Sequence, residues 1–221
     1  MAGTREVAGE GGSILTFTPE DHVYRLDGAP VPWAVTQLLE AAGVSPNYSK
    51  VNPHVLRHAR LRGIHVDACC DLDDADDLDW SSVSPEAVGY VQAWQAFKAD
   101  FGYEPVLAQP LLYHPAYGYA GTSDSIGVLD GTAAVVERKA TAKMAASYAL
   151  QTAAYAAPGI HIAPRGGGRL EAAPWGTEPV MRLGVHLKPG GQYELVAYDD
   201  PDDEAAWLGV VALARWRKLR G

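Results

Sequence analysis

The strongest constraint on the fold is a strand–turn–strand pattern between residues 119 and 139. Two runs rich in strand-forming residues, 119–129 and 132–139, are separated by Asp130-Gly131. An Asp-Gly pair between two such runs is typical of a two-residue hairpin, because both central residues of that turn need a positive φ. The pattern therefore predicts an antiparallel strand pair, and the fold has to include a sheet built around it.

The other patterns add strands and helices around this pair. Alternating apolar and polar residues predict strands, whereas capping residues next to apolar periodicity predict helices. The predicted strands are 14–17, 22–26, 105–113, 180–188 and 192–197. The predicted helices are 34–42, 52–70, 84–101, 142–156 and 201–219, with a glycine-rich surface loop at 165–175. This order predicts an α/β chain of the α+β type, in which helices cover a mixed sheet.

Length and composition favour one folded domain at 14–221, preceded by a flexible glycine-rich tail at 1–13. The chain has 221 residues, of which 48% are hydrophobic and 20% charged, as in ordinary globular domains. No apolar run reaches the roughly 18–20 residues that a membrane span needs, and the first residues lack an apolar signal core. We therefore expect a cytoplasmic protein without a membrane partner.

The net charge at first argues against a nucleic-acid partner. The chain has 27 Asp and Glu residues, 18 Lys and Arg residues and a net charge of −9, whereas proteins that bind nucleic acids usually have a basic surface. Eleven acidic residues fall in two clusters, six at 71–79 and five at 199–204; without them, 16 acidic residues face 18 basic ones. We interpret the cluster at 71–79 as a solvated loop. The alternatives are that it mimics the DNA backbone or that it repels wrong substrates.

Polar residues near one end of the hairpin form a candidate site. In a strand, residues i and i+2 face the same side, so Glu137 and Lys139 are predicted to point together while Arg138 points away. Pairing in the hairpin can bring Asp124 near the same end, although the register stays open. Two carboxylates beside an ammonium suit a hard divalent cation. The alternative is a solvated ion pair on an exposed strand.

The helix predicted after this hairpin has a polar and aromatic stripe. Tyr148, Gln151 and Tyr155 stand at i, i+3 and i+7, which places them on one side of a helix. One interpretation is an aromatic core stripe in which a backbone group satisfies Gln151. The other is that the stripe faces the cation site, where Gln151 binds a metal-bound water or a phosphate.

The order of the polar motifs along the chain resembles the core of the PD-(D/E)XK nucleases of the RecB type. The motifs are His65 on an upstream helix, Asp124, Glu137-Arg138-Lys139 and Gln151-x-x-x-Tyr155. That group includes the mitochondrial genome-maintenance exonuclease and the CRISPR spacer-acquisition nucleases. The resemblance covers about residues 61–157 and implies a restriction-endonuclease-like core with flanking helices. The iron–sulfur cysteines of several relatives are missing, because Cys69 and Cys70 are the two cysteines of the chain.

The resemblance implies a role for each candidate residue. The catalytic residues would be Asp124, Glu137 and Lys139, with Lys139 serving the attacking water. The ligands of one or two Mg²⁺ or Mn²⁺ ions would be His65, Asp124, Glu137 and the backbone carbonyl of Arg138. The residues in contact with metal-bound water or DNA would be Gln151, Tyr155, Tyr148 and Arg62, the last within a locally basic stretch at 50–62.

We therefore expect a metal-dependent deoxyribonuclease, and an exonuclease rather than an endonuclease, that acts in recombination, repair or DNA end processing. The resemblance suggests a phage origin and hence a bacterial or phage-infected cell. DNA is the expected partner, together with a single-strand annealing or recombination protein. No iron–sulfur cluster is expected, nor ATP, because the glycines at 166–168 lack the Gly-Lys-Ser/Thr ending of a nucleotide loop. The alternatives are a catalytically inactive nuclease-fold protein that binds DNA or inhibits an enzyme, and a ribonuclease.

Overall fold

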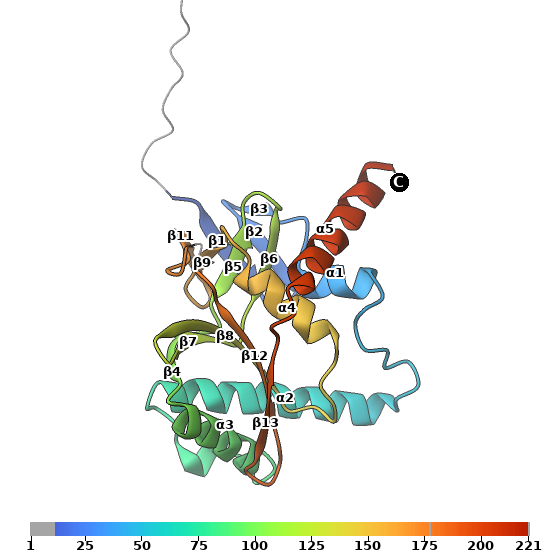
Figure 1. Ribbon diagram of the computed structural model, residues 1–221. Helices are drawn as coiled ribbons and strands as arrows, with labels where there is room; N and C mark the ends of the chain where they lie inside the picture. The colour runs from blue at the N-terminus through green and yellow to red at the C-terminus, as the bar shows by residue number, and fades with distance from the viewer. Residues whose placement is uncertain (1–11, 177, 221) are drawn as a thin grey trace, which may run out of the picture.

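The structure is a computed structural model that describes residues 12–176 and 178–220. Residues 1–11, which make up most of the predicted N-terminal tail, lie outside the described residues. Within the described ranges the chain forms three β-sheets and five α-helices (Figure 1). The predicted class, α/β with a mixed sheet that carries helices, is therefore confirmed.

A five-stranded mixed sheet forms the centre of the molecule. Its strands, in spatial order, are β13 (Tyr193–Ala197), β12 (Met181–Leu187), β8 (Thr132–Lys139), β7 (Ser125–Leu129) and β4 (Glu104–Ala108). Strands β12 and β8 are parallel, and the other neighbours are antiparallel. Because α4 (Ser147–Ala156) lies between β8 and β12 in the chain, it provides the crossover that a parallel pair requires.

Two smaller sheets lie beside the central one. The first contains β11 (Glu171–Ala172), β9 (His161–Ala163), β5 (Leu111–His114) and β6 (Tyr119–Thr122). The second contains β10 (Gly167–Arg169), β1 (Ile14–Thr18), β2 (Val23–Leu26) and β3 (Ala29–Pro30). The predicted hairpin at 14–17 and 22–26 is the β1–β2 pair, in which Phe17 lies opposite Tyr24.

Helices cover both faces of the central sheet. On one face α2 (Pro53–Asp74) and α3 (Val88–Phe101), which the 3₁₀ helix Trp80–Ser82 separates in the chain, share a core with Ala134 and Val136 of β8. On the other face α1 (Val35–Ala41), α4 (Ser147–Ala156) and α5 (Asp202–Arg220) share a core with Val135. Because side chains alternate along a strand, Glu137 and Lys139 belong to the α4 face and Arg138 to the α2 face.

The Asp-Gly hairpin forms as predicted, but its first strand is interrupted. Asp130 and Gly131 have φ angles of 49° and 74°, and Leu129 lies opposite Thr132. Instead of one strand at 119–129, the chain forms β6 and β7, which belong to different sheets, and Asp124 lies in the bend between them. Because Asp124 lies in this bend and not in a strand, its carboxylate can turn toward the end of β8.

Three other predicted boundaries are wrong for identifiable reasons. The strand predicted at 105–113 divides into β4 and β5 at Gln109-Pro110, where Gln109 has a φ of 46° and proline supplies no N–H for the ladder. Helix α4 begins at Ser147 rather than at 142. The region 165–175 is not wholly loop, because β10 pairs with β1, a partner far away in the sequence.

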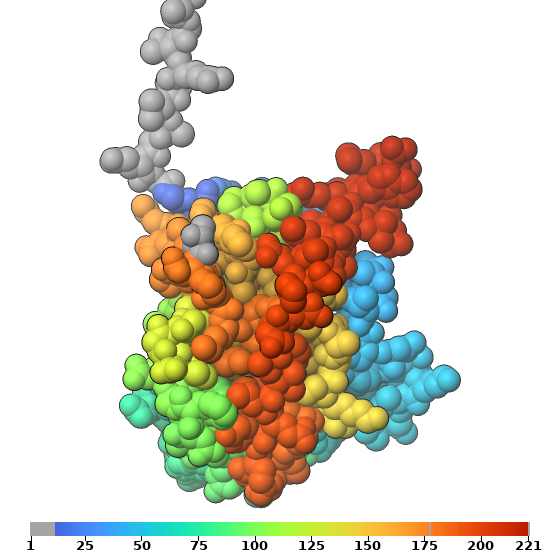
Figure 2. Space-filling view, viewed as in Figure 1, coloured from blue at the N-terminus to red at the C-terminus, as the bar shows by residue number. Residues whose placement is uncertain are grey.

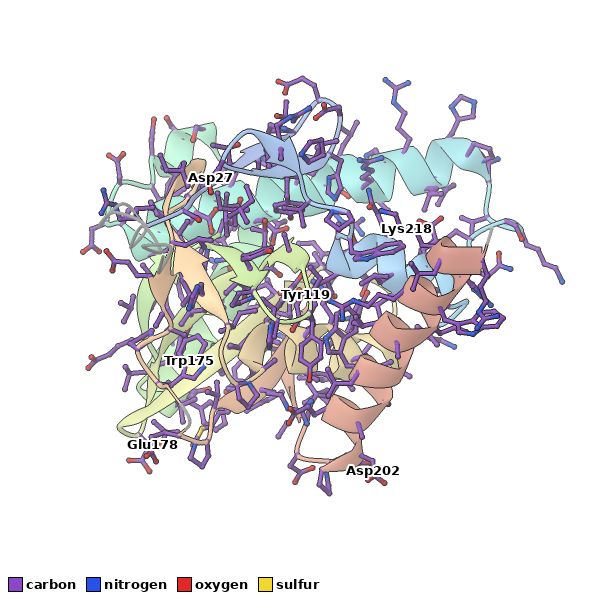
Figure 3. All side chains as sticks on the ribbon, turned by 90° about the horizontal axis from the view of Figure 1, so that it is seen from above. Asp27, Tyr119, Trp175, Glu178, Asp202 and Lys218 are labelled. Atoms are coloured by element: carbon purple, nitrogen blue, oxygen red, sulfur yellow. The ribbon has the colours of Figure 1, made fainter. Side chains whose placement is uncertain are left out.

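Helix α5 closes the α4 side of the molecule. Trp207 of α5 is fully buried, and its ring meets that of Tyr119 edge-on at a centroid distance of 5.0 Å. In Figure 3, Asp202 and Lys218 mark the two ends of this helix and Tyr119 lies in the interior. The light-blue segment that joins α1 to α2 projects from the side of the molecule (Figure 2). Among the described helices, none combines the length and apolar character needed to cross a membrane.

Candidate active site

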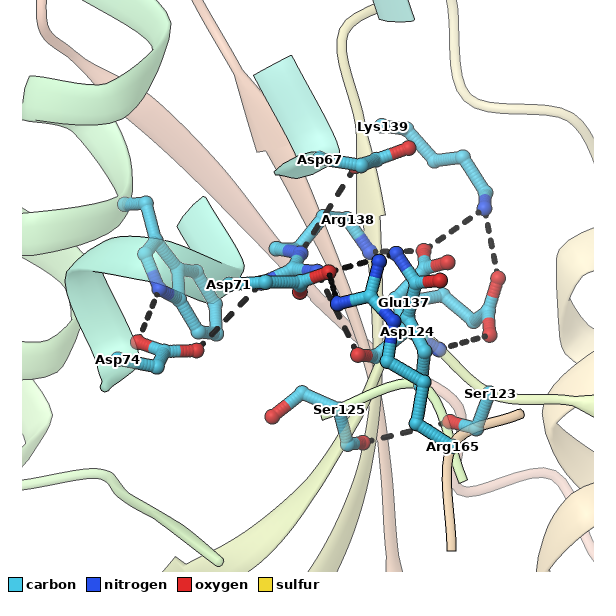
Figure 4. Close-up of polar contacts among 12 residues, drawn as sticks. Asp67, Asp71, Asp74, Ser123, Asp124, Ser125, Glu137, Arg138, Lys139 and Arg165 are labelled. Atoms are coloured by element: carbon cyan, nitrogen blue, oxygen red, sulfur yellow. Dashed lines mark hydrogen bonds and ion pairs between the residues drawn. The ribbon is translucent and has the colours of Figure 1, made fainter. Parts of the chain in front are cut away.

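The bend after β6 and the end of β8 bring Asp124, Glu137 and Lys139 together (Figure 4). The Lys139 ammonium lies 2.6 Å from Glu137 Oε2 and 3.3 Å from Asp124 Oδ2. The backbone N–H of Arg138 donates to Asp124 Oδ2 at 2.9 Å, and the backbone N–H of Asp124 donates to Glu137 Oε1 at 3.3 Å. Two carboxylates and one ammonium therefore share a single space.

The three side chains differ in their access to water. The Glu137 side chain is 1% exposed, whereas those of Asp124 and Lys139 are 20% and 16% exposed. Burial raises the pKa of Glu137 above its ordinary value, and the nearby charge of Asp124 raises it further. Burial alone would lower the pKa of Lys139, but the two carboxylates hold it well above its ordinary value. Lys139 therefore stays charged and offsets the negative charge of the pair.

Helix α4 contributes the second layer of contacts. The Gln151 side-chain amide donates to Glu137 Oε2 at 3.0 Å and to the hydroxyl of Tyr155 at 3.2 Å. The Lys139 ammonium lies 5.1 Å from the centre of the Tyr148 ring. The stripe of Tyr148, Gln151 and Tyr155 thus faces the end of β8, and Tyr155 also packs in the core.

His65 does not lie with the carboxylates. Its Nε2 accepts a hydrogen bond from the backbone N–H of Ser84 at 3.2 Å and lies 3.7 Å from Cys69 Sγ. These contacts turn the imidazole toward the segment that precedes α3. The arrangement of α2 therefore gives His65 a contact between helices, in place of the contact with Asp124 and Glu137 that we expect from the resemblance.

Arg62 is also engaged within the protein. Its guanidinium donates to Glu86 Oε1 at 3.1 Å and to the backbone carbonyl of Ala140 at 3.2 Å, and it lies 5.4 Å from the centre of the Tyr90 ring. Arg62 thereby joins α2 to the chain directly after β8. Its side chain is 21% exposed, so a small part of it can still reach a phosphate.

Arg138 points to the opposite face of β8, as the alternation predicts, and enters an acidic network on α2. Its guanidinium is fully buried and lies 2.5 Å from Asp71 and 3.5 Å from Asp74. The ring of Trp94 lies 5.1 Å away. The cluster at 71–79 is therefore not a solvated loop at its beginning, because α2 continues to Asp74 and places these acids against a buried cation.

Asp67 is the residue that the sequence interpretation missed. Its side chain is 34% exposed, and its Oδ1 lies 3.8 Å from Arg138 Nε (Figure 4). Burial raises the pKa of Asp67 and the charge of Asp124 raises it further, while Arg138 and Lys139 act in the opposite direction. Asp67 and Asp71 stand one helical turn apart, so the acidic spacing along α2 is the signal that could have revealed it.

The donor set at this place fits a hard divalent cation. Asp124 and Glu137 offer carboxylate oxygens, and Mg²⁺ is commonly bound by one or two carboxylates while it retains several waters. A buried carboxylate beside a second one also needs a nearby positive charge, which here comes from Lys139. Within the ranges that the structure describes, no three His, Cys, Asp or Glu side chains lie together as a metal-binding group. The fit is thus to an open site with two carboxylates.

A scan of known protein families finds no family that matches this sequence, and a search of curated proteins finds no significant relative.

Proposed function

We propose that this chain is a metal-dependent deoxyribonuclease with a PD-(D/E)XK core. The observation that supports it best is the convergence of Asp124, Glu137 and Lys139 within hydrogen-bond distance of one another. The sequence selects these residues by their spacing together with the resemblance to the RecB-type nucleases. A solvated ion pair is the simpler alternative for a Glu-x-Lys sequence, but a Glu137 side chain that is 1% exposed does not fit that description.

Each residue has a task in this proposal. Asp124 and Glu137 would hold Mg²⁺ or Mn²⁺, with Asp67 rather than His65 as the neighbouring donor from α2. The cation, when bound, supplies a more acidic attacking water and polarises the phosphate. Lys139 keeps its proton, so its ammonium positions the nucleophile and offsets negative charge that develops on the phosphate. Gln151 fixes the orientation of the Glu137 carboxylate through its amide hydrogen bond.

The substrate and setting in the proposal rest on the family resemblance. DNA is the partner, an exonuclease acting at DNA ends is the activity, and recombination, repair or end processing is the context. The two acidic clusters leave the rest of the chain close to neutral, so the affinity for DNA should depend on the bound cation and fall steeply with salt.

The experiment is hydrolysis of end-labelled DNA by the purified protein in Mn²⁺, in Mg²⁺ and in EDTA. We expect degradation in both metals and none in EDTA. Lys139→Ala and Glu137→Gln should each reduce the rate by about 100-fold or more, the scale on which one electrostatic group in an active site acts. Lys143→Ala is the matched control, because Lys143 is an exposed lysine four residues further along.

Equal rates for the wild type and Lys139→Ala would refute the proposal. Binding of DNA without hydrolysis in either metal would favour the inactive nuclease-fold protein. Faster cleavage of an RNA strand than of the matching DNA strand would favour a ribonuclease.

A further inference from the structure

A cavity of about 390 Å³ opens between the β1–β2 hairpin and α4, outside the carboxylate cluster. Its volume lies within the range of about 300–1,000 Å³ that is typical of small-molecule sites. The hairpin contributes the aromatic residues Phe17, His22 and Tyr24 to its wall. The function proposed above for Asp124, Glu137 and Lys139 does not involve this cavity.

The cavity lies next to the candidate active site. Gln151 and Tyr155 of α4 form part of its wall, and the Gln151 amide at the same time donates to Glu137 Oε2 at 3.0 Å. One side chain therefore separates the cavity from the buried carboxylate. A molecule in the cavity would therefore lie next to a group bound at Glu137.

Part of the cavity wall is aromatic. The rings of Phe17 and Tyr24 lie 4.5 Å apart between centroids, and the exposed His22 meets Phe17 edge-on at 5.1 Å. The Tyr24 hydroxyl is already paired with Thr122 Oγ1 at 2.8 Å, so Tyr24 offers its ring rather than a free polar group.

The cavity wall also includes a guanidinium group. Arg165 also lines the cavity, its side chain is 55% exposed, and its Nη1 lies 2.9 Å from Asp71 Oδ2. This ion pair holds the guanidinium in place while its other N–H groups remain available. An aromatic wall and a fixed guanidinium that line the same small cavity match a molecule that has a flat ring and a phosphate.

We propose that this cavity, here called the hairpin pocket and lined by Phe17, His22, Tyr24, Gln151, Tyr155 and Arg165, binds the nucleoside next to the scissile phosphate of an unpaired DNA strand. The base stacks on Phe17 and His22, and the flanking phosphate meets Arg165. A paired base cannot enter a cavity of this size with its partner attached, so the strand has to be single or frayed. The placement next to a scissile phosphate rests on the proposed function, whereas base binding does not.

The test measures binding in EDTA, so that it does not require hydrolysis. Isothermal titration calorimetry compares a short oligothymidylate with an abasic strand of the same length, which keeps the phosphates and lacks the bases. We expect the wild-type protein to bind the oligothymidylate about tenfold or more tightly than the abasic strand, as stacking of a base on an aromatic residue implies.

Substitutions then test which residues cause the preference for the oligothymidylate over the abasic strand. Phe17→Ala and His22→Ala should each remove most of the difference between the two strands and leave the abasic affinity unchanged. Trp80→Ala is the control, because Trp80 is 44% exposed, is not part of the cavity wall and should not change the preference. His22 is exposed, so His22→Ala keeps the test valid if Phe17→Ala fails to fold.

The outcomes separate the pocket from the catalytic proposal. Equal affinity of the wild type for both strands, or a preference that survives both substitutions, would overturn the pocket even if Mn²⁺-dependent hydrolysis is observed. A base preference that depends on Phe17 and His22 would support the pocket even if no hydrolysis occurs, in which case only the catalytic proposal fails.

Discussion

Replacement of Arg138 by methionine tests the buried ion network between β8 and α2. The Arg138 side chain is 0% exposed, and those of its partners Asp71 and Asp74 are 4% and 5% exposed. Methionine keeps much of the aliphatic volume, so the main effect is that two buried carboxylates lose the buried cation, and Asp71 retains Arg165 and Asp74 retains Lys98 as partners nearer the surface. Removal of one partner from a buried pair typically destabilises by about 3–5 kcal/mol. That is a large part of the roughly 5–15 kcal/mol by which a folded domain is stable.

Urea unfolding followed by tryptophan fluorescence measures this loss. We expect Arg138→Met to lower the free energy of unfolding by about 3–5 kcal/mol with an unchanged dependence on urea. The melting temperature should fall by roughly 6–20 °C, at about 2–4 °C per kcal/mol for a chain of this length. Arg169→Met is the control: Arg169 is exposed, and its loss should stay within about 0.5 kcal/mol.

A double substitution separates charge from packing. Asp71→Asn removes a partner of Arg138 in the wild type, but in the Arg138→Met background it removes a carboxylate that has lost one of its two cations and keeps Arg165. We therefore expect the double variant to be more stable than the sum of the two single losses predicts, by about 0.5–3 kcal/mol. A loss below about 1 kcal/mol for Arg138→Met, or strict additivity in the double variant, would show that the buried ion pairs of Arg138 do not stabilise the fold.

Three further outcomes follow from the structure. Trp207→Ala should lower the free energy of unfolding by about 3–5 kcal/mol, because this ring is fully buried; a loss no larger than that of Trp216→Ala, at a position 55% exposed, would argue against the α5 packing. Gly121→Ala should lower the same free energy by about 1–3 kcal/mol, because a Cβ there would lie 2.5 Å from the Tyr155 ring; an unchanged urea midpoint would contradict this contact. Burial raises the pKa of Glu137, so its neutral form persists above the ordinary glutamic acid value of about 4.3, and a cation has to displace a proton there. The calorimetric affinity for Mn²⁺ should therefore keep rising with pH well above pH 5, and a flat profile from that point would count against a raised pKa.

Local patterns were sufficient for those parts of the fold that neighbouring residues determine. Asp130-Gly131 requires a tight turn, and Asn52-Pro53 begins α2 as a cap and first-turn proline do, with Asn52 Oδ1 accepting the N–H of His54 at 2.9 Å. The alternation along β8 likewise predicted that Glu137 and Lys139 share a face. Each of these features depends on residues close together in the sequence.

The remaining features depend on which elements pack together. The pairing of β10 with β1, and the bend that separates β6 from β7, arise from sheets that form over long sequence distances. The assignment of His65 rested on its order in the chain, whereas the rotation of α2 decides that Asp67 lies near Arg138 and Asp124. An acidic stripe on a helix becomes informative only when its buried partner, Arg138, is known.

If Asp124 and Glu137 form an open cation site, calorimetric titration with Mn²⁺ detects it without any substrate. We expect binding by the wild type, and binding weaker by at least about tenfold in Asp124→Asn and in Glu137→Gln. His65→Ala should bind like the wild type, because its imidazole contacts Ser84 and Cys69 instead. Equal Mn²⁺ affinity in the wild type and both carboxylate variants, or no binding by the wild type, would contradict the account.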